Sequence, residues 1–470
     1  MAPPGSTAHP YMPNSEPSTK REMLDALGVS SVDELFEQIP ADHRLKGELK
    51  LPPALVSEVE LRRHLLQTLA KNETCEENTS FLGGGCWQHH VPAICDEIAG
   101  RSEFLTNIWG TASSDHGRNQ ALFEFCSQIG ELVNMDCVGL PVYSWGCASG
   151  HAIRMAARIT GRREVLIPSS LDPERLSVIR TYCEPVETRN HIDVTMVDYD
   201  SESGQVDLED LAKKMSSSVA AVYFENPSYL GVIETQGAEI AQLARDCGAE
   251  VIVGVDPISL GLLAAPADYG ADIAVGTIQP LGLHLNCGGG MGGFIATRDE
   301  ERYARAYPTL LLSLCDTVEG GERAFAMTLL EQSSYDAREE ANDWTGHTVH
   351  LWAIASAAYM ALMGPEGFAE VGRLIVARSH YAARKIGELD GVRIAFPAGF
   401  FKEFVVSVDG TGKTVADVNR GLRRHGIFGG HDLSKDFPEL GQSALYCVTE
   451  VHTRDDVDRL VEALREVTAP

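Results

Sequence analysis

The middle of the chain alternates short apolar runs with helical segments, and this alternation constrains the fold more than any other feature. Runs of this length, separated by helices, are typical of βα units, which build a mostly parallel sheet with helices on both faces. We therefore predict an α/β protein. The predicted strands contain the runs EVLIP, VTMVDY, VAAVYFENP, EVIVGVDP, ADIAVG and GGFIAT.

The remaining segments differ in composition and pattern. The first residues are rich in Pro and Ser, which predicts a mobile tail. The end of the chain mixes longer helical patterns with strands such as EFVVSV and ALYCVTE, which predicts a smaller α+β domain. The predicted parts are a tail at 1–20, a helical segment at 21–113, a large α/β domain at 114–320, an interdomain segment at 321–345 and an α+β domain at 346–470.

Two Ser-x-x-Glu patterns mark predicted helix starts in the N-terminal part. One is formed by Ser31 and Glu34, and the other by Ser57 and Glu60. In this pattern the serine side chain accepts a hydrogen bond from the first helical turn. Both segments that follow are therefore predicted to be helical.

The charge and the cysteines narrow the classes of function. The chain has 39 Lys and Arg against 67 Asp and Glu, a net charge of −28. Such a surface repels phosphate backbones and anionic lipid, so we expect neither nucleic acid nor a membrane as a partner. The 11 cysteines form no Cys-x-x-Cys pair and no cluster at zinc-ligand spacing, which predicts reduced thiols and no metal. With no signal-peptide run, we expect a cytoplasmic protein.

A succession of motifs resembles the P-protein of the glycine cleavage system, in particular its N-terminal half or separate subunit 1. The likeness runs in the same order from about residue 21 to about residue 467. The motifs are FLGGG-CWQHHVP, RSEFLT, HGRNQALFEFCSQIGELVNMD, ENPSYLGVIE, VDPISLGLL, GADIAVGTIQPLG, FFKEFVVSV, GIFGGHDL and TEVHTRDDVDRLVEAL. The resemblance implies pyridoxal-phosphate fold type I, the aspartate-aminotransferase-like architecture, and a subunit of a glycine dehydrogenase (decarboxylating). That enzyme decarboxylates glycine and transfers the aminomethyl group to the lipoyl arm of a carrier protein.

Pyridoxal phosphate acts as an electron sink, and the protein holds it and sets its electronics. The resemblance implies three parts: a small-residue loop at a helix N-terminus for the phosphate, a carboxylate for the pyridine nitrogen, and a lysine that binds the cofactor covalently. Each candidate also has an ordinary structural explanation, namely a capped Gly-bearing loop, a strand-ending turn or a helix cap. The candidate cofactor-binding residues, if the pocket is retained, are Gly146, Cys147, Ala148, Ser149, Asn226 and Asp256.

The lysine is missing from the position that the family implies. It would follow the strand after the one that carries Asp256, within GADIAVGTIQPLGLHLNCGGGMGG, and that stretch contains none. No lysine lies between Lys214 and Lys385. Subunit 1 of the P-protein is similar in lacking the lysine, and the resemblance assigns the active site, and with it the pyridoxal phosphate, to a homologous lysine-bearing subunit 2.

Two histidines are possible contributors to a shared cleft. His89 lies in CWQHHVP, where the family motif also has a histidine, and His116 lies in SDHGRNQ. The adjacent side chains of His89 and His90 do not readily converge on one metal ion, so a hydrogen-bonding role is the main alternative.

Three functions remain open from the sequence. The first is a subunit-1-like component that supports a lysine-bearing partner, with glycine as substrate and a lipoyl carrier as acceptor. The second is a specialised homologue for another small amino acid or a carrier-bound substrate, acting alone with noncovalent pyridoxal phosphate or with a partner. The third is a noncatalytic scaffold or binding module, which a fold alone does not exclude.

Overall fold

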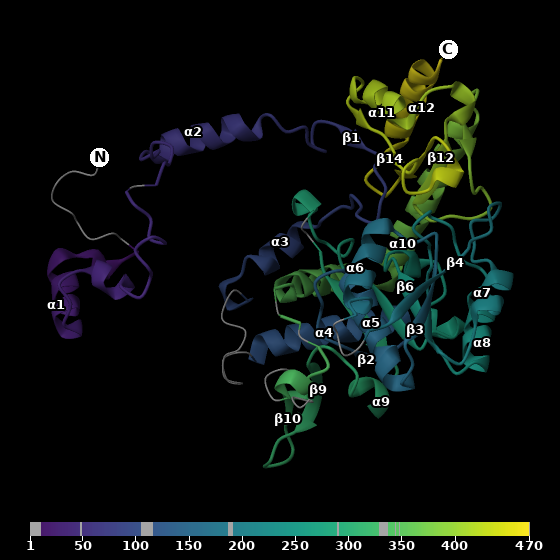
Figure 1. The fold of residues 1–470 in the computed structure, drawn as a ribbon. Helices are drawn as coiled ribbons and strands as arrows, with labels where there is room; N and C mark the ends of the chain where they lie inside the picture. The colour runs from purple at the N-terminus through teal and green to yellow at the C-terminus, as the bar shows by residue number, and fades with distance from the viewer. Residues whose placement is uncertain are drawn as a thin grey trace. The chain divides into compact units, whose positions relative to one another are not determined.

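The structure is a computed structural model. It describes residues 11–47, 49–104, 116–186, 191–288, 291–328, 337–343, 345–346 and 348–469. Contacts divide the chain into two units, Met1–Glu73 and Thr74–Pro470. Both are drawn in Figure 1. No helix among the described residues is long and apolar enough to cross a membrane.

The described residues of the first unit contain two α-helices, α1 (Pro17–Leu27) and α2 (Glu58–Leu69), and none of the residues of these helices is buried. The side chain of Ser57 accepts a hydrogen bond from the backbone N–H of Glu60 at the start of α2, as predicted. Ser31 makes no such bond, and only a 3₁₀ turn follows it. The Glu34 carboxylate accepts from the backbone N–H of Ser30 instead, so this part of the prediction is wrong.

A seven-stranded sheet forms the centre of the second unit. Its order is β2-β8-β7-β6-β5-β3-β4, and β8 is antiparallel to both of its neighbours while the other pairs are parallel. All six predicted runs form strands of this sheet. The strands are β2 (Cys137–Val138), β3 (Glu164–Pro168), β4 (Asp193–Val197), β5 (Val219–Glu225), β6 (Glu250–Val255), β7 (Ile273–Thr277) and β8 (Gly293–Thr297).

Helices cover both faces of this sheet because successive strand side chains point to opposite sides. Val222 and Val253 pack in a core with α4, α7, α8 and the start of α10. Their neighbours Tyr223 and Ile252 pack on the other face with α5 and α6. The helices before the C-terminal part are α3 (Ala93–Ala99), α4 (His116–Val133), α5 (Trp145–Thr160), α6 (Pro173–Cys183), α7 (Leu208–Lys214), α8 (Gly237–Asp246) and α9 (Glu301–Ala304).

A smaller antiparallel sheet, in the order β11-β12-β15-β14, forms the C-terminal part. Its core contains side chains from the end of α10 and from α11 and α12. The elements of this part are α10 (His350–Gly387), β11 (Arg393–Ile394), β12 (Glu403–Ser407), α11 (Val415–Arg423), β14 (His431–Asp432), β15 (Ser443–Cys447) and α12 (Arg454–Thr468). Two further pairs lie outside both sheets: β1 (Thr79–Ser80) with β13 (Ile427–Phe428), and β9 (Leu311–Asp316) with β10 (Arg323–Thr328).

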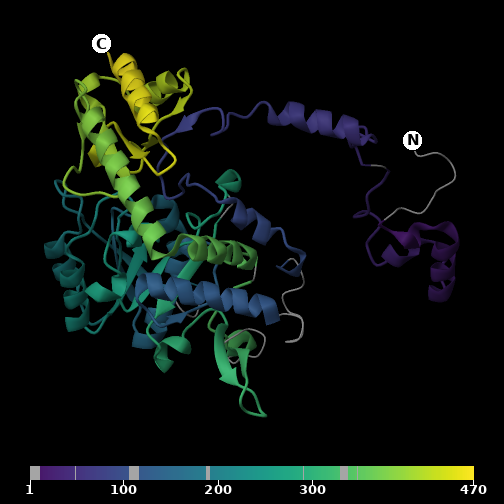
Figure 2. The same cartoon turned by 180° about the vertical axis from the view of Figure 1, so that it is seen from behind.

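The long element α10 joins the two sheets, as Figure 2 shows. It is two helices in sequence, because Gly364 has a φ of 56° and a ψ of 179° and Pro365 follows it. Glycine adopts this conformation without a Cβ clash, and proline cannot continue the hydrogen-bond ladder of the preceding turn. The chain that follows α10 brings the start of β12 to the carboxyl end of β6, where Lys402 contacts Asp256.

Candidate functional site

Asp256 directly follows β6 at the carboxyl end of the parallel strands, where open α/β sheets bind ligands. Its side chain is buried, and one carboxylate oxygen accepts a hydrogen bond from the backbone N–H of Ile258 at 3.1 Å. The other oxygen lies 2.7 Å from the Nζ atom of Lys402. The carboxylate that was predicted to contact a cofactor therefore forms a buried ion pair with a lysine of the same chain.

Lys402 directly precedes β12 and is only 1% exposed. Its Nζ atom lies 3.3 Å from the ring centroid of Trp87 and 3.1 Å from the Nε2 atom of His89. Its backbone is left-handed, with a φ of 50°, and its carbonyl accepts from the N–H of Val448. The anion, the aromatic face and the imidazole together replace the water that a buried ammonium loses.

His89 connects this lysine to a second carboxylate. An ammonium has no acceptor, so the Nε2 atom of His89 accepts from Lys402 and its Nδ1–H donates to Glu450 at 2.8 Å. Glu450 also accepts from the backbone N–H of His90 at 2.8 Å. Burial raises the pKa of Glu450, but the contact with His89 and the bond from His90 outweigh burial and hold the pKa at about 2. His89 is thus a structural link inside the site.

The expected phosphate loop is the beginning of a helix. Ser144 caps α5 by accepting from the N–H of Cys147 at 3.2 Å, and the helix starts at Trp145. The candidates Gly146, Cys147, Ala148 and Ser149 are therefore buried residues of its first turns, and not a loop that precedes it. The hydroxyl of Ser149 contacts the hydroxyl of Tyr223 at 3.1 Å, so it is occupied by a protein group.

Arg175 of α6 covers the Trp145 ring, with 3.8 Å between its guanidinium carbon and the ring centroid. The same guanidinium lies 2.7 and 2.8 Å from the two carboxylate oxygens of Glu225, at the end of β5. Tyr223 also donates to Glu225 at 2.6 Å. A second buried ion pair therefore occupies the space beside Asp256.

These side chains leave little room. Trp87, Trp145, Arg175, Glu225 and Asp256 are among the residues around a cavity of about 10 Å³. That volume holds about one water molecule. A pyridine ring with its phosphate does not fit, and the carboxylate that would contact the ring nitrogen already contacts Lys402.

Two further candidates from the sequence are Asn226 and His116. Asn226 follows β5 and uses its amide internally: its Oδ1 accepts from the N–H of Glu234 at 3.1 Å, and its Nδ2 donates to the carbonyl of Glu234 at 3.2 Å. His116 is the first residue of α4, and its side chain lies outside the described residues.

After β7, where the family implies a lysine, Gln279 exchanges two hydrogen bonds with the backbone of Trp87, at 3.1 and 2.9 Å.

Sequence reasoning missed Lys402, Arg175 and Glu225. The signal for Glu225 was present, because a carboxylate ends the apolar run VAAVYFE. No local pattern pointed to Lys402, because its partner Asp256 lies far away in the sequence and only the tertiary fold joins them.

Replacing Glu450 with glutamine should reduce the free energy of unfolding by about 1–2 kcal/mol at pH 7, because the buried bonds from His89 and His90 lose an ionised acceptor. The pKa of Glu450 is lowered in the folded protein, so its contribution is present above pH 4.5 and lost as the pH falls towards about 2. Urea unfolding at several pH values should therefore show a difference from the wild type that shrinks with acid. Glu462→Gln, at an exposed position of α12, is the control. A difference independent of pH would contradict the assignment.

The fold is that of the pyridoxal-phosphate-dependent enzymes of fold type I, which confirms the predicted fold class. A sphingosine-1-phosphate lyase from Burkholderia pseudomallei has this fold, with a TM-score of 0.66 at 15% identity over 91% of this chain and 94% of that one. Within this class, the sequence model of the glycine cleavage system P-protein matches residues 9–464. The chain belongs to that family.

Individual relatives agree with the family. The probable glycine dehydrogenase (decarboxylating) subunit 1 of Staphylothermus marinus is 37% identical over 98% of this chain and 98% of its own length. The protein of the same name from Carboxydothermus hydrogenoformans is 39% identical over 97% and 99%. A crystal structure of glycine decarboxylase (P-protein) of the glycine cleavage system, in inhibitor-bound form, has a TM-score of 0.87 at 32% identity and covers 98% of this chain and 100% of that one. The expectation of a subunit-1-like member of this family is confirmed.

Proposed function

We propose that the chain is the subunit-1 component of a two-chain, pyridoxal-phosphate-dependent glycine decarboxylase, and that its partner binds the cofactor. The observation that carries this proposal is the buried ion pair between Lys402 and Asp256, at 2.7 Å, with only a cavity of about 10 Å³ beside Asp256. The ammonium of Lys402 lies beside the carboxylate that a protonated pyridine nitrogen would contact. The charge of Asp256 is thus balanced by a lysine of the same chain.

Protein groups also occupy the positions where the fold would bind the phosphate and where it would carry the lysine. The first turn of α5 carries the bulky Trp145, under Arg175, where a phosphate would need open backbone N–H groups. The segment after β7 provides Gln279, which has no amine that forms a Schiff base and which is bonded to Trp87. Binding of pyridoxal phosphate would require two buried ion pairs to break, so we assign the chemistry of that cofactor to the partner chain.

The proposed partner is a homologous chain that has a lysine after the strand equivalent to β7. Glycine is the proposed substrate, and a lipoyl arm on a carrier protein is the proposed acceptor. In the complex, the bound pyridoxal phosphate would supply the electron sink for loss of the carboxylate, and this chain would support the partner's cleft. The 11 free cysteines fit a reducing compartment, and we propose a cytoplasmic location.

A permanent complex of this kind needs a large and apolar interface. The first unit offers apolar area of its own, since no residue of α1 or α2 is buried. Several of its large apolar side chains are exposed, among them Leu27, Phe36, Val59, Leu65 and Leu69. We propose that this unit contributes to the heterodimer.

The test is co-expression of the full chain with the homologous lysine-bearing chain, followed by purification of the pair. The two chains should co-purify, and borohydride should fix pyridoxal phosphate to a peptide of the partner only. The full chain purified alone and mixed with excess pyridoxal phosphate should show no aldimine absorbance that survives dialysis. A cofactor adduct on this chain, or the absence of any complex with the partner, would overturn the proposal.

A further inference from the structure

Helix α5 carries four chemically active side chains along one face. Cys147, His151, Arg154 and Arg158 are spaced by four, three and four residues, so they follow one another along the same side of the helix. The stripe faces Asp343, which contacts three of these four side chains. None of these contacts belongs to the ion-paired site at Asp256.

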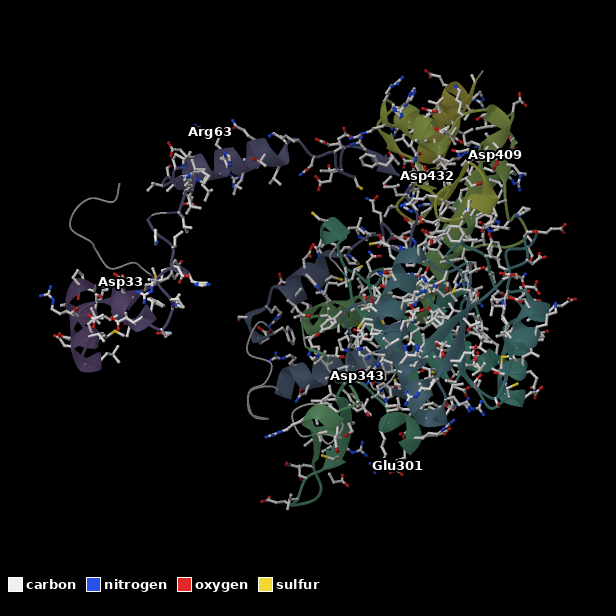
Figure 3. The ribbon with its side chains drawn as sticks, viewed as in Figure 1. Asp33, Arg63, Glu301, Asp343, Asp409 and Asp432 are labelled. Carbon is white, nitrogen blue, oxygen red and sulfur yellow. The ribbon has the colours of Figure 1, made fainter. Side chains whose placement is uncertain are left out.

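Asp343 is the centre of the cluster and is labelled in Figure 3. Its Oδ1 lies 3.0 Å from Nε of Arg154, and its Oδ2 lies 2.9 Å from a terminal nitrogen of Arg158 and 3.6 Å from Nδ1 of His151. Burial raises the pKa of Asp343, but His151 and the two arginines outweigh it and lower the pKa to about 2. A permanent negative charge therefore lies beside the imidazole.

Cys147 lies one turn before His151 and is 3% exposed. Its backbone N–H is bonded to Ser144 at the N-terminus of α5, and its sulfur lies 3.1 Å from the hydroxyl of Tyr182. Burial raises the pKa of the Cys147 thiol, but hydrogen bonds and charge from His151, with the Tyr182 hydroxyl, lower it overall. Burial lowers the pKa of His151, but Asp343 and Cys147 raise it overall.

Other buried cysteines show what burial does without such neighbours. Burial raises the pKa of Cys126 and of Cys183 to about 12, and that of Cys95 to about 11. Cys447, also buried, has a raised pKa as well. A thiol, an imidazole and a carboxylate in series, at the start of a helix, is the arrangement that activates a cysteine nucleophile.

We propose that Cys147, His151 and Asp343 form a peroxide-reactive thiol site, in which the His151 ring, one helical turn from Cys147, takes the proton of the thiol and Asp343 stabilises the charge that the ring gains. The Cys147 sulfur attacks one oxygen of hydrogen peroxide, so an S–O bond forms and the O–O bond breaks. The leaving hydroxide takes the proton of the His151 ring and departs as water. The sulfur is oxidised by two electrons to a sulfenic acid, and the peroxide is reduced.

The cover over the site favours a small oxidant. The hydroxyl of Thr345 lies 3.3 Å from Nε2 of His151, and the N–H of Gly346 donates to the hydroxyl of Tyr143 at 2.6 Å. These bonds hold Thr345 against His151 and Gly346 against Tyr143, and Cys147 is only 3% exposed, so a two-oxygen molecule reaches the thiol more easily than a bulky alkylating reagent. The titratable and charged groups around Cys147 and the His151 ring are Tyr182, which contacts the Cys147 sulfur, and Asp343, which contacts the ring. Arg154 and Arg158 contact Asp343, and Tyr143 acts on Tyr182.

The test is exposure of the full chain to hydrogen peroxide between pH 6 and pH 8, with a sulfenic-acid-specific cyclic diketone and mass spectrometry of each cysteine peptide. The exposed Cys75 and Cys315 are internal references. An ordinary thiol loses about tenfold in rate per pH unit below its pKa, which is about 100-fold from pH 8 to pH 6. Cys147 should slow less than about tenfold over the same range.

The variant His151→Gln should give Cys147 the same steep pH dependence as the two references, and His284→Gln, at an exposed histidine, should not. Because His151→Gln is a buried change, circular dichroism checks its folding, and the wild-type pH profile decides the question by itself if that variant fails to fold. The proposal is overturned if Cys147 stays unlabelled in the native chain, if its rate falls in parallel with Cys75 and Cys315, or if folded His151→Gln keeps the wild-type profile. It does not depend on the proposed function, because no step involves a partner or cofactor.

Discussion

Replacing Lys402 with methionine should lower the free energy of unfolding of the chain by about 3–5 kcal/mol, the cost of leaving one partner of a buried ion pair without the other. Methionine keeps the length of the lysine stem and packs in an apolar site. It does not replace the ammonium, which lies 2.7 Å from Asp256 and over the ring of Trp87. Urea denaturation followed by circular dichroism measures the loss.

A double-mutant cycle separates the ion pair from packing. Asp256→Asn should also destabilise the chain. When it is combined with Lys402→Met, neither side chain of the pair carries a charge, so the double variant should lose less than the sum of the two single variants. Lys435→Met, at an exposed position, should stay within about 0.5 kcal/mol of the wild type. Additive effects of the two buried substitutions would show that Lys402 and Asp256 do not stabilise each other.

The ion pair between Lys402 and Asp256 also shows which part of the site the sequence could predict. Asp256 was predictable, because a carboxylate at the end of an apolar run lies at the ligand-binding edge of an α/β sheet. Its partner was not, because Lys402 comes from the start of β12, beyond the long α10. The absence of lysine between Lys214 and Lys385 shows that the expected lysine is missing, but it does not predict where the other lysines of the chain pack.

The fold could be predicted more fully than the site, because the fold depends on the local periodicity of apolar residues. Short apolar runs such as EVIVGV and VAAVYFE predict buried parallel strands, and β6 and β5 contain them. Strand direction is different: GGFIAT forms β8, which is antiparallel to β7, and no feature of that run distinguishes it from a parallel strand. The sequence also does not determine where α5 starts, because small residues at 146–149 fit both a loop and a first helical turn.

Asp343→Asn should lower the free energy of unfolding by about 3 kcal/mol at pH 7, because one carboxylate serves Arg154, Arg158 and His151 and all three lose their anion. Asparagine retains the shape and one acceptor oxygen, so the loss reports charge more than volume. The lowered pKa of Asp343, about 2, means that its contribution is present above pH 3.8 and lost as the pH falls towards 2. Denaturant unfolding at pH 7 and at pH 3 measures both the loss and its decrease with acid.

Limited proteolysis distinguishes a local role of Asp343 from a global one. Asp343 and Thr345 contact side chains of α5, and Gly346 is bonded to Tyr143, so removal of the charge should speed cleavage beside residue 343 before it speeds cleavage elsewhere. Asp390→Asn, at an exposed carboxylate, is the control and should change neither measurement. Equal stability of Asp343→Asn and the wild type, with unchanged cleavage, would mean that the arginines find other partners. The Asp343 carboxylate would then not fix its part of the chain on α5.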